Sequence, residues 1–417
     1  MKITGIKGLE VLDSRGNPTI EVEVKAGRFK EKAIAPSGAS TGSREAIELR
    51  DGGKRFDGKG VLKAVEQVKK ISKKLIGRDV VKQKTLDQII IDYDGTGNKS
   101  KIGGNSSTAL SIAMFKTACS SREREFYECF DSLGFKEKTE MPVPLMNIIN
   151  GGMHAGNRLS IQEFQIIPVK FKTFKEALTA GVEVYHELEK ELIKKIGLNA
   201  KNVGDEGGFA PNISKTREAL DFIEKSIEAA GYTGSVFMGF DSASNSFYKN
   251  GFYSIDGKTI DSEKLLEYYE RLVEDYDIIS MEDPFNENDF ESFSQIKSLK
   301  TQVIGDDLFT TNIERLKEGI EKNSANALLL KVNQIGTLTE ALETAALCKK
   351  NDYEIIVSHR SGDTEDSFIA DLSVGINTGQ IKTGAPARAE RTSKYNRLLE
   401  IESKTNAKLS KKILKFT

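Results

Sequence analysis

Three apolar runs, QVIGDD at 302–307, ALLLK at 327–331 and EIIVSHR at 354–360, each lead directly into charged residues. Upstream, SVFMGFD at 235–241 and IISMED at 278–283 have the same form. Short continuous apolar runs of this kind are typical of strands that are buried on both faces. Neighbouring runs are separated by the length of one helix and two loops. The pattern therefore predicts strands and helices that alternate along the chain.

The alternation extends from residue 138 to residue 417, a length that suits one (β/α)8-type barrel. An open, doubly wound α/β sheet is the competing architecture. Residues 1–130 differ, because strands come first and helices follow, which is an α+β pattern. We therefore expect an α/β protein with two domains, an N-terminal α+β capping domain at 1–130 and a barrel at 138–417.

Smaller signals place individual elements. Ile20, Val22 and Val24 alternate with charged residues, as in a strand with one solvated face. We expect helices near 60–76 and 106–121, the second capped by Asn105 or Ser106 and burying one face. A longer apolar stripe at 178–196 ends at Gly197, a residue typical of the position after a helix. The basic stretch 404–415 is expected to be a solvated tail.

Composition excludes several classes of protein. The 417 residues carry 61 Lys and Arg against 62 Asp and Glu, so a dedicated nucleic-acid or membrane-surface protein is not indicated. No apolar run approaches the ~18 residues of a membrane span, and the start of the chain does not resemble a secretory signal. The three cysteines have no metal-like spacing and fit a reducing compartment. We expect a cytoplasmic protein.

The charged residues that follow the runs are the main functional signal. Asp241, Glu282, Asp306 and Lys331 each stand at the end of a predicted strand. The carboxyl ends of parallel strands in a barrel converge on one mouth, where active sites lie. Three carboxylates without a Cys or His cluster indicate a hard cation, Mg²⁺ rather than Zn²⁺. Any single acid of this kind is more simply a helix cap or a solvated loop residue, but three in register weaken that interpretation.

Lys331 follows three leucines, so its stem is expected to be buried. Desolvation and a nearby metal ion would lower its pKa from ~10.4 toward ~7–8 and make it a general base. The alternative is that Lys331 is a structural partner of the carboxylates.

Further groups are expected at the same mouth. Arg360, Ser361 and Lys382 suit a phosphate or a carboxylate. Upstream, His154 and Glu206 lie among glycines, and Glu163 is a second acid able to share a proton with Glu206 for delivery to a leaving group. Alone, each of these has an ordinary explanation as a turn residue or a solvated acid.

The chain resembles the enolase family over essentially its whole length. The resemblance rests on motifs in the family's order, which are LDSRGNPT, APSGASTG, NGGMHAGN, QEF, VGDEGGFAP, EDPF, GDDL, LLLKVNQIGTL, SHRSGDTEDSFIADL and QIKTGAPAR. It implies an N-terminal domain on an unusual barrel and the Mg²⁺-dependent, glycolytic interconversion of 2-phosphoglycerate and phosphoenolpyruvate.

The resemblance also implies roles for residues. Lys331 would remove the C2 proton, and Glu206, supported by Glu163, would assist departure of the C3 hydroxyl. The implied substrate-binding residues are His154, Gln162, His359, Arg360, Ser361 and Lys382. The first Mg²⁺ would be held by Asp241, Glu282 and Asp306. Ser40 of a lid would bind a second Mg²⁺ that arrives with substrate. The family further implies a homodimer or an octamer of dimers.

Three residues depart from the family pattern, namely Arg158, Ser160 and Ser246, and none has an implied chemical role. Two other functions remain open. One is a related lyase or racemase acting on another carboxylic acid, and the other is a binding protein with a relic site. The phosphate-binding groups and the full acid and base set oppose both.

Overall fold

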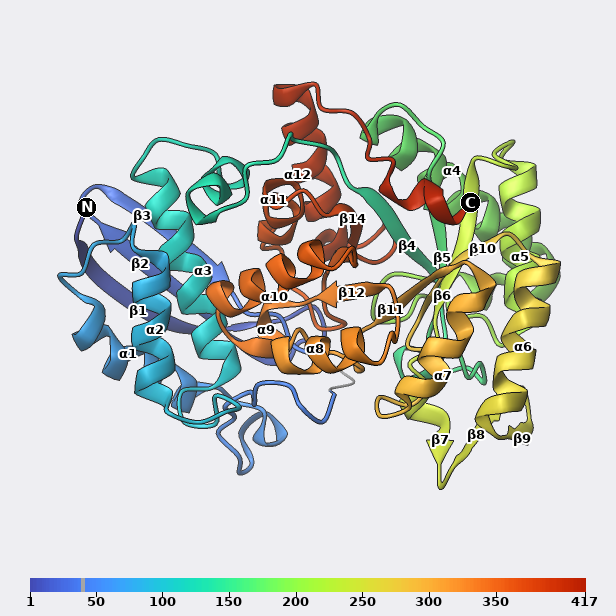
Figure 1. Cartoon of the computed structure of the whole chain (residues 1–417), viewed down its shortest axis with the longest axis horizontal. Helices are drawn as coiled ribbons and strands as arrows, with labels where there is room; N and C mark the ends of the chain where they lie inside the picture. Colours follow the sequence, from blue (N-terminus) through green and yellow to red (C-terminus); the bar gives the residue numbers. More distant parts are fainter. Residues whose placement is uncertain (39–41) are drawn as a thin grey trace.

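The computed structural model describes residues 1–38 and 42–417. Figure 1 shows a small N-terminal sheet with its helices on one side of the molecule and a closed barrel on the other. The N-terminal sheet is antiparallel in the order β1-β2-β3. Its elements and the helices beside it are β1 (Ile3–Leu12), β2 (Pro18–Ala26), β3 (Phe29–Ile34), α1 (Leu62–Leu75), α2 (Gln83–Asp94) and α3 (Gly104–Ser120).

The predicted alternation in β2 is confirmed, since Ile20, Val22 and Val24 are all fully buried. They pack under α3, which lies across β2 and β3. Helix α2 was not predicted from the sequence.

The prediction for α3 is wrong in two respects. The helix is buried on nearly all sides rather than on one face, because it is enclosed between the small sheet and its neighbouring helices. It begins after Gly103, whose φ is 90°, and neither Asn105 nor Ser106 caps it. The Asn105 side chain instead accepts hydrogen bonds from the backbone N–H groups of Leu49 and Ser106.

The barrel is closed, which confirms the barrel prediction over the doubly wound sheet. Its strands, in the order β10-β11-β12-β13-β14-β4-β5-β6, are β4 (Val143–Asn150), β5 (Glu163–Pro168), β6 (Val236–Asp241), β10 (Ile278–Glu282), β11 (Gln302–Gly305), β12 (Ala327–Leu330), β13 (Glu354–Ser358) and β14 (Gly379–Lys382).

One strand of the barrel, β5, runs antiparallel to both of its neighbours, β4 and β6. Glu163, the first residue of β5, pairs in register with Asp241, the last residue of β6. The reversal therefore puts the start of β5 at the same mouth as the ends of the parallel strands.

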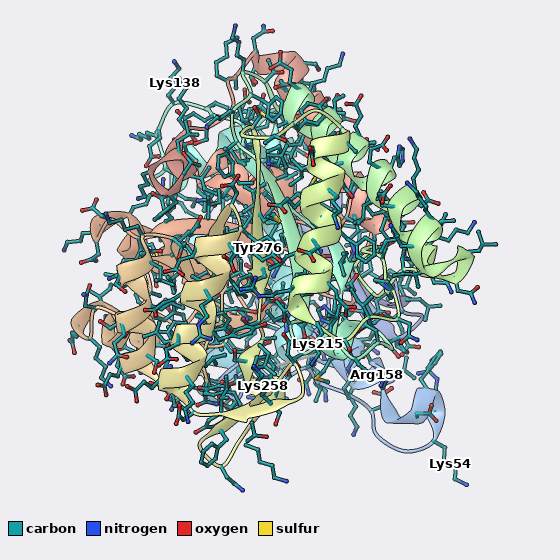
Figure 2. The ribbon with its side chains drawn as sticks, turned by 90° about the vertical axis from the view of Figure 1, so that its right-hand side faces the viewer. Lys54, Lys138, Arg158, Lys215, Lys258 and Tyr276 are labelled. Carbon is teal, nitrogen blue, oxygen red and sulfur yellow. The ribbon has the colours of Figure 1, made fainter. Side chains whose placement is uncertain are left out.

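Helices cover the outside of the barrel, and a small sheet projects from it. They are α4 (Phe174–Ile196), α5 (Thr216–Ala229), α6 (Ser262–Asp275), α7 (Phe290–Gln295), α8 (Ile313–Glu321), α9 (Val332–Ile335), α10 (Leu338–Lys350), α11 (Phe368–Gly375), α12 (Ala389–Thr405), and β7 (Tyr248–Lys249), β8 (Phe252–Ile255) and β9 (Lys258–Ile260). Figure 2 shows Lys138, which precedes β4, and Lys258 of the small sheet at opposite ends of the molecule. No helix among residues 1–38 and 42–417 is long and apolar enough to cross a membrane.

The expectation of a solvated C-terminal tail is wrong. Leu409 forms a bridge with Met141 just before β4, and Ile413 is fully buried. The lysines are also engaged, because Lys404 pairs with Glu125 and Lys415 with Glu354. The basic composition of the segment masked two apolar residues, Leu409 and Ile413, which hold it against the barrel.

Helix α4 begins with a capping box that gives a test of local stability. Thr173 Oγ1 accepts a hydrogen bond from the Glu176 N–H at 3.1 Å, and the Glu176 carboxylate accepts one from the Thr173 N–H. Thr173→Ala should reduce the opening free energy of the first-turn amides by about 1 kcal/mol, measured by native-state hydrogen exchange. Thr179→Ala, which changes a threonine in the second turn of the same helix, is the matched control and should leave those amides unchanged.

Candidate active site

A pocket of about 290 Å³ lies at the mouth of the barrel. It is lined by Gly38, His154, Gln162, Glu163, Glu206, Asp241, Asp306, Lys331, Ser358, His359, Arg360, Ser361 and Lys382. Among the predicted site residues that the structure describes, Glu282 does not line the pocket but accepts a hydrogen bond from the lining residue Lys382. Ser40 lies outside the described residues.

The order of the strands separates the pocket into two halves. Lys331 follows β12 and Glu163 begins β5, and in the closed order these two strands face each other across the barrel. One arc between them, β11, β10 and β6, carries the three predicted metal ligands at its strand ends. The other arc consists of β13, β14 and β4, and the ends of β13 and β14 carry His359, Arg360 and Lys382. The strand ends of one arc thus supply acids and those of the other supply cations, and the Lys382 side chain reaches across to the acids.

The acidic arc is held together by two lysines. Lys382 Nζ lies 3.2 Å from Asp241, 2.7 Å from Glu282 and 3.1 Å from Glu163. Burial and the neighbouring carboxylates raise the pKa of Asp241 and of Glu282. For Lys382, burial opposes the charged form, but the surrounding carboxylates outweigh it and raise its pKa well above the ordinary value. Acids outnumber the lysines here, so the donor set suits an additional hard cation.

The carboxylate of Asp306 sets the direction of the Lys331 pKa shift, so the lowering expected beside a bound metal ion stays a prediction. Lys331 Nζ donates to Asp306 Oδ2 at 2.5 Å, and its side chain is 11% exposed. Burial lowers its pKa, but the charge of Asp306 prevails and raises it above the ordinary lysine value. The same contact lowers the pKa of Asp306 against the effect of burial.

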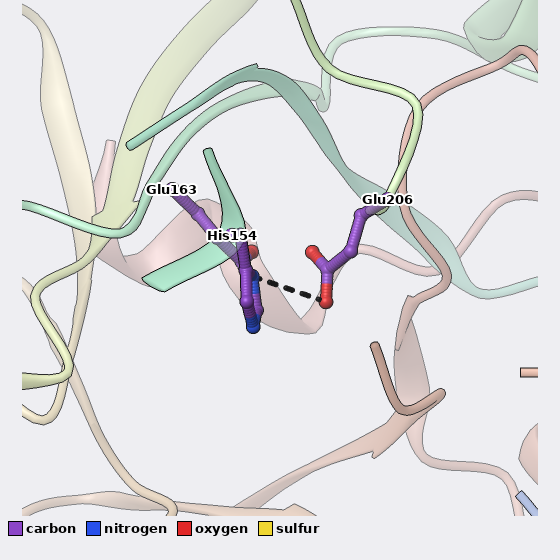
Figure 3. Close-up of side chains that lie close together, drawn as sticks. All are labelled: His154, Glu163 and Glu206. Carbon is purple, nitrogen blue, oxygen red and sulfur yellow. Dashed lines mark ion pairs between the residues drawn. The ribbon is translucent and has the colours of Figure 1, made fainter. Parts of the chain in front are cut away.

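Opposite Lys331, two buried glutamates and a histidine form a compact group. Figure 3 shows Glu206 beside His154, with Glu163 behind the imidazole. Glu206 Oε1 lies 3.5 Å from His154 Nδ1, and Glu206 Oε2 accepts from Asn147 at 2.9 Å. Burial and the charge of Glu206 raise the pKa of Glu163. Because two neighbouring carboxylates repel each other, Glu163 and Glu206 favour a state in which they share one proton.

Close backbone contacts position Glu206. A Cβ on Gly204 would lie 2.4 Å from the His154 carbonyl oxygen, and one on Gly208 would lie 2.8 Å from Asn150 Oδ1. The glycines on either side of Glu206 therefore let its loop lie directly against the segment that carries His154.

The cationic arc is joined to the N-terminal unit. Arg360 Nη1 donates to Glu45 at 2.8 Å, and Arg15 Nη1 donates to Ser361 Oγ at 3.4 Å. Ser37 and Gly362 exchange backbone hydrogen bonds. Glu45 and Arg15 were not among the predicted site residues, although Arg15 lies in the motif LDSRGNPT and Glu45 follows APSGASTG by three residues.

Sequence reasoning also missed two acids behind Asp306. Asp283 accepts from the backbone N–H groups of Asp306 at 3.0 Å and Asp307 at 2.7 Å. The three carboxylates lie close enough to share one cation. Burial, reinforced by Asp306, raises the pKa of Asp307 to about 7. The doublets Glu282-Asp283 and Asp306-Asp307 were the available signal.

Comparison with known proteins agrees with this geometry. Residues 3–130 match the family description "Enolase, N-terminal domain", and residues 138–412 match "Enolase, C-terminal TIM barrel domain". The chain is 54% identical over 404 residues to the enolase of Methanocaldococcus jannaschii, covering 96% of this chain and 95% of that protein. It is 51% identical over 409 residues to the enolase of Thermococcus gammatolerans, covering 96% and 94%, and 53% identical over 406 residues to that of Sulfurisphaera tokodaii, covering 96% of each. The chain therefore belongs to the enolase family, the phosphopyruvate hydratases, which are Mg²⁺-dependent lyases of glycolysis that interconvert 2-phosphoglycerate and phosphoenolpyruvate.

Proposed function

We propose that the chain dehydrates 2-phospho-D-glycerate to phosphoenolpyruvate with Lys331 as the base at C2 and Glu206 as the acid at the C3 hydroxyl. The observation that carries the assignment is that β12 and β5 face each other across the barrel. A substrate between them presents its C2 proton to Lys331 and its hydroxyl to the Glu163–Glu206 pair. Glu163 supports Glu206 by sharing the proton that Glu206 delivers.

Asp241, Glu282 and Asp306 would hold the first Mg²⁺. Their oxygen-only donors, their burial and the excess of acid over lysine suit this ion. When bound, it stabilises the negative charge that develops on the substrate carboxylate as the C2 proton leaves. We assign a second Mg²⁺, which arrives with the substrate, to Ser40.

The remaining pocket residues bind the substrate. Arg360 and Ser361 would hold the phosphate through a guanidinium fork and a hydroxyl, and Lys382 would hold the substrate carboxylate. His154, Gln162 and His359 would line the space around C3. The backbone hydrogen bonds between Ser37 and Gly362 support a contact between the proposed phosphate-binding loop and the segment that leads into Ser40.

Metal removal tests the proposed function directly. With 2-phosphoglycerate and Mg²⁺, we expect an increase in ultraviolet absorbance as the enol double bond forms. A chelator should abolish the increase, and excess Mg²⁺ should restore it. Folded protein that gives no chelator-sensitive signal contradicts the proposal. A racemase would convert a carboxylic acid without new absorbance, and a binding protein would show neither reaction.

We further propose a division into a capping domain at 1–130 and a catalytic barrel at 138–417, supported by the ranges of the two family matches. We propose a cytoplasmic location and a homo-oligomer, either a dimer or an octamer of dimers. Sedimentation velocity separates these two states.

A further inference from the structure

Arg391 of α12 is completely buried directly behind the catalytic pocket. We infer that Arg391 is a positioning residue for loss of the C3 hydroxyl, because it holds His359 in the tautomer with its proton on Nε2 and ties the Glu206 loop to the Arg360–Ser361 loop. The inference deepens the reaction proposed above and rests on the acid role of Glu206.

The guanidinium of Arg391 is almost fully engaged. Nη1 lies 2.6 Å from His359 Nδ1 and donates to the Arg360 carbonyl at 2.7 Å. Nη2 donates to the carbonyls of Asp205 at 3.0 Å and Ser361 at 2.7 Å. The partners belong to two loops that are far apart in the sequence.

These contacts determine the state of His359. A guanidinium has donors and no acceptor, so the 2.6 Å contact requires an unprotonated Nδ1 on the imidazole. The proton of the neutral ring therefore sits on Nε2, which lies 3.5 Å from Glu206 Oε1. Burial and the charge of Arg391 also hold the pKa of His359 well below its ordinary value. His359 thus presents a hydrogen-bond donor to the acid side of the pocket.

The same arginine fixes the distance between the acid and the phosphate-binding loop. Arg391 Nη2 bonds the carbonyl of Asp205, the residue directly before Glu206, and the carbonyl of Ser361. The backbone makes room for it at Gly384, where a Cβ would lie 2.8 Å from Arg391 Cδ and 3.0 Å from His359 Cε1. Arg391 therefore contacts His359, Arg360 and Ser361 of the pocket and the neighbour of a fourth pocket residue, Glu206, without lining the pocket itself.

The tautomer is directly measurable. The chain has three histidines, so selective ¹⁵N-histidine labelling gives three side-chain spectra, assigned by His154→Gln and His186→Gln. We expect His359 in the Nε2–H form in the wild type. Arg391→Met, which removes every donor, should shift it toward the Nδ1–H form. Arg391→Lys, which still offers only donors, should retain Nε2–H.

Kinetics separate positioning from simple support of the fold. Arg391→Met should slow dehydration of 2-phosphoglycerate by about 10–100-fold, as for other residues that orient site groups. Exchange of the C2 proton with solvent should remain within about threefold of wild type, because Lys331 lies across the barrel. The control is Arg397→Met on the same helix. Arg397 pairs with Asp371 at 2.7 Å, and its replacement should lower thermal stability without changing the tautomer or the ratio of the two rates.

Two results overturn the inference. One is a wild-type His359 with its proton on Nδ1, a measurement that needs no variant to fold. The other is an Arg391→Met protein with an unchanged tautomer and an equal loss of exchange and dehydration. A wild type that is inactive toward 2-phosphoglycerate overturns the proposed reaction instead, while the tautomer measurement still tests the role of Arg391.

Discussion

Replacing Lys331 with alanine should lower kcat by about 10³–10⁴-fold, within the range for loss of a general base. Exchange of the C2 proton with solvent should disappear, while Mg²⁺ binding should remain. The reason is position, since Lys331 ends the strand opposite the glutamate pair and projects a largely buried ammonium into the pocket. The charge of Asp306 raises the Lys331 pKa. A cation on Asp306 would neutralise that carboxylate and allow Lys331 to give up its proton at neutral pH.

The measurement is hydrogen–deuterium exchange at C2, followed by NMR, with calorimetric titration of Mg²⁺ on the same protein. Lys99→Ala is the matched control. Lys99 is also a buried lysine paired with a carboxylate, lying 2.8 Å from Glu340, and its side chain is 4% exposed. Unchanged exchange in Lys331→Ala would remove Lys331 as the base. Loss of Mg²⁺ binding would instead support the alternative that it is a structural partner of the carboxylates.

The barrel and the charged ends of its strands could be predicted because both are local signals. An apolar run buried on both faces, followed by Asp241, Asp306 or Lys331, needs only a few consecutive residues to be recognised. Strand β2 of the N-terminal sheet could be predicted equally well, since the alternation around Val22 is a period-two pattern. All the predicted pocket residues that the structure describes lie at one mouth or contact a residue there.

What escaped prediction depends on contacts between distant segments. The reversed direction of β5, which brings Glu163 to the mouth, is set by its pairing with β4 and β6 rather than by its own residues. The position of α3 is set by what encloses it, so a pattern search for one apolar face misjudged it. No sequence pattern singled out Arg391, and its role follows from four contacts with two remote loops.

The Lys331 pKa shows a different limit. Burial was predicted, and the direction of its effect was correct. The distance to Asp306 decides the outcome, however, and no spacing in the sequence gives it. A lysine between a carboxylate and a cation can have either a raised or a lowered pKa. The sequence therefore indicates that Lys331 and Asp306 are neighbours, but not the direction of the pKa shift.

Replacing Glu206 with glutamine should slow dehydration by about 10²–10⁴-fold while exchange of the C2 proton continues, because the proposed base and the proposed acid lie on opposite sides of the pocket. Glutamine retains the size of the side chain and an oxygen that accepts from Asn147, so the loop should keep its position. Glu340→Gln, a change to the carboxylate paired with Lys99, controls for the amide substitution.

The two glutamates should differ in the size of the loss. Glu206 lies between His154 and His359, at 3.5 Å from each imidazole, whereas Glu163 contacts Lys382 beside the proposed metal ligands. Glu163→Gln removes the partner that shares the proton but leaves the acid in place, so we expect a smaller loss, about 10-fold. Equal losses would mean that the pair acts as one unit. Loss of C2 exchange in Glu206→Gln would place Glu206, rather than Lys331, at the proton-removal step. The assigned roles of base and acid would then be exchanged.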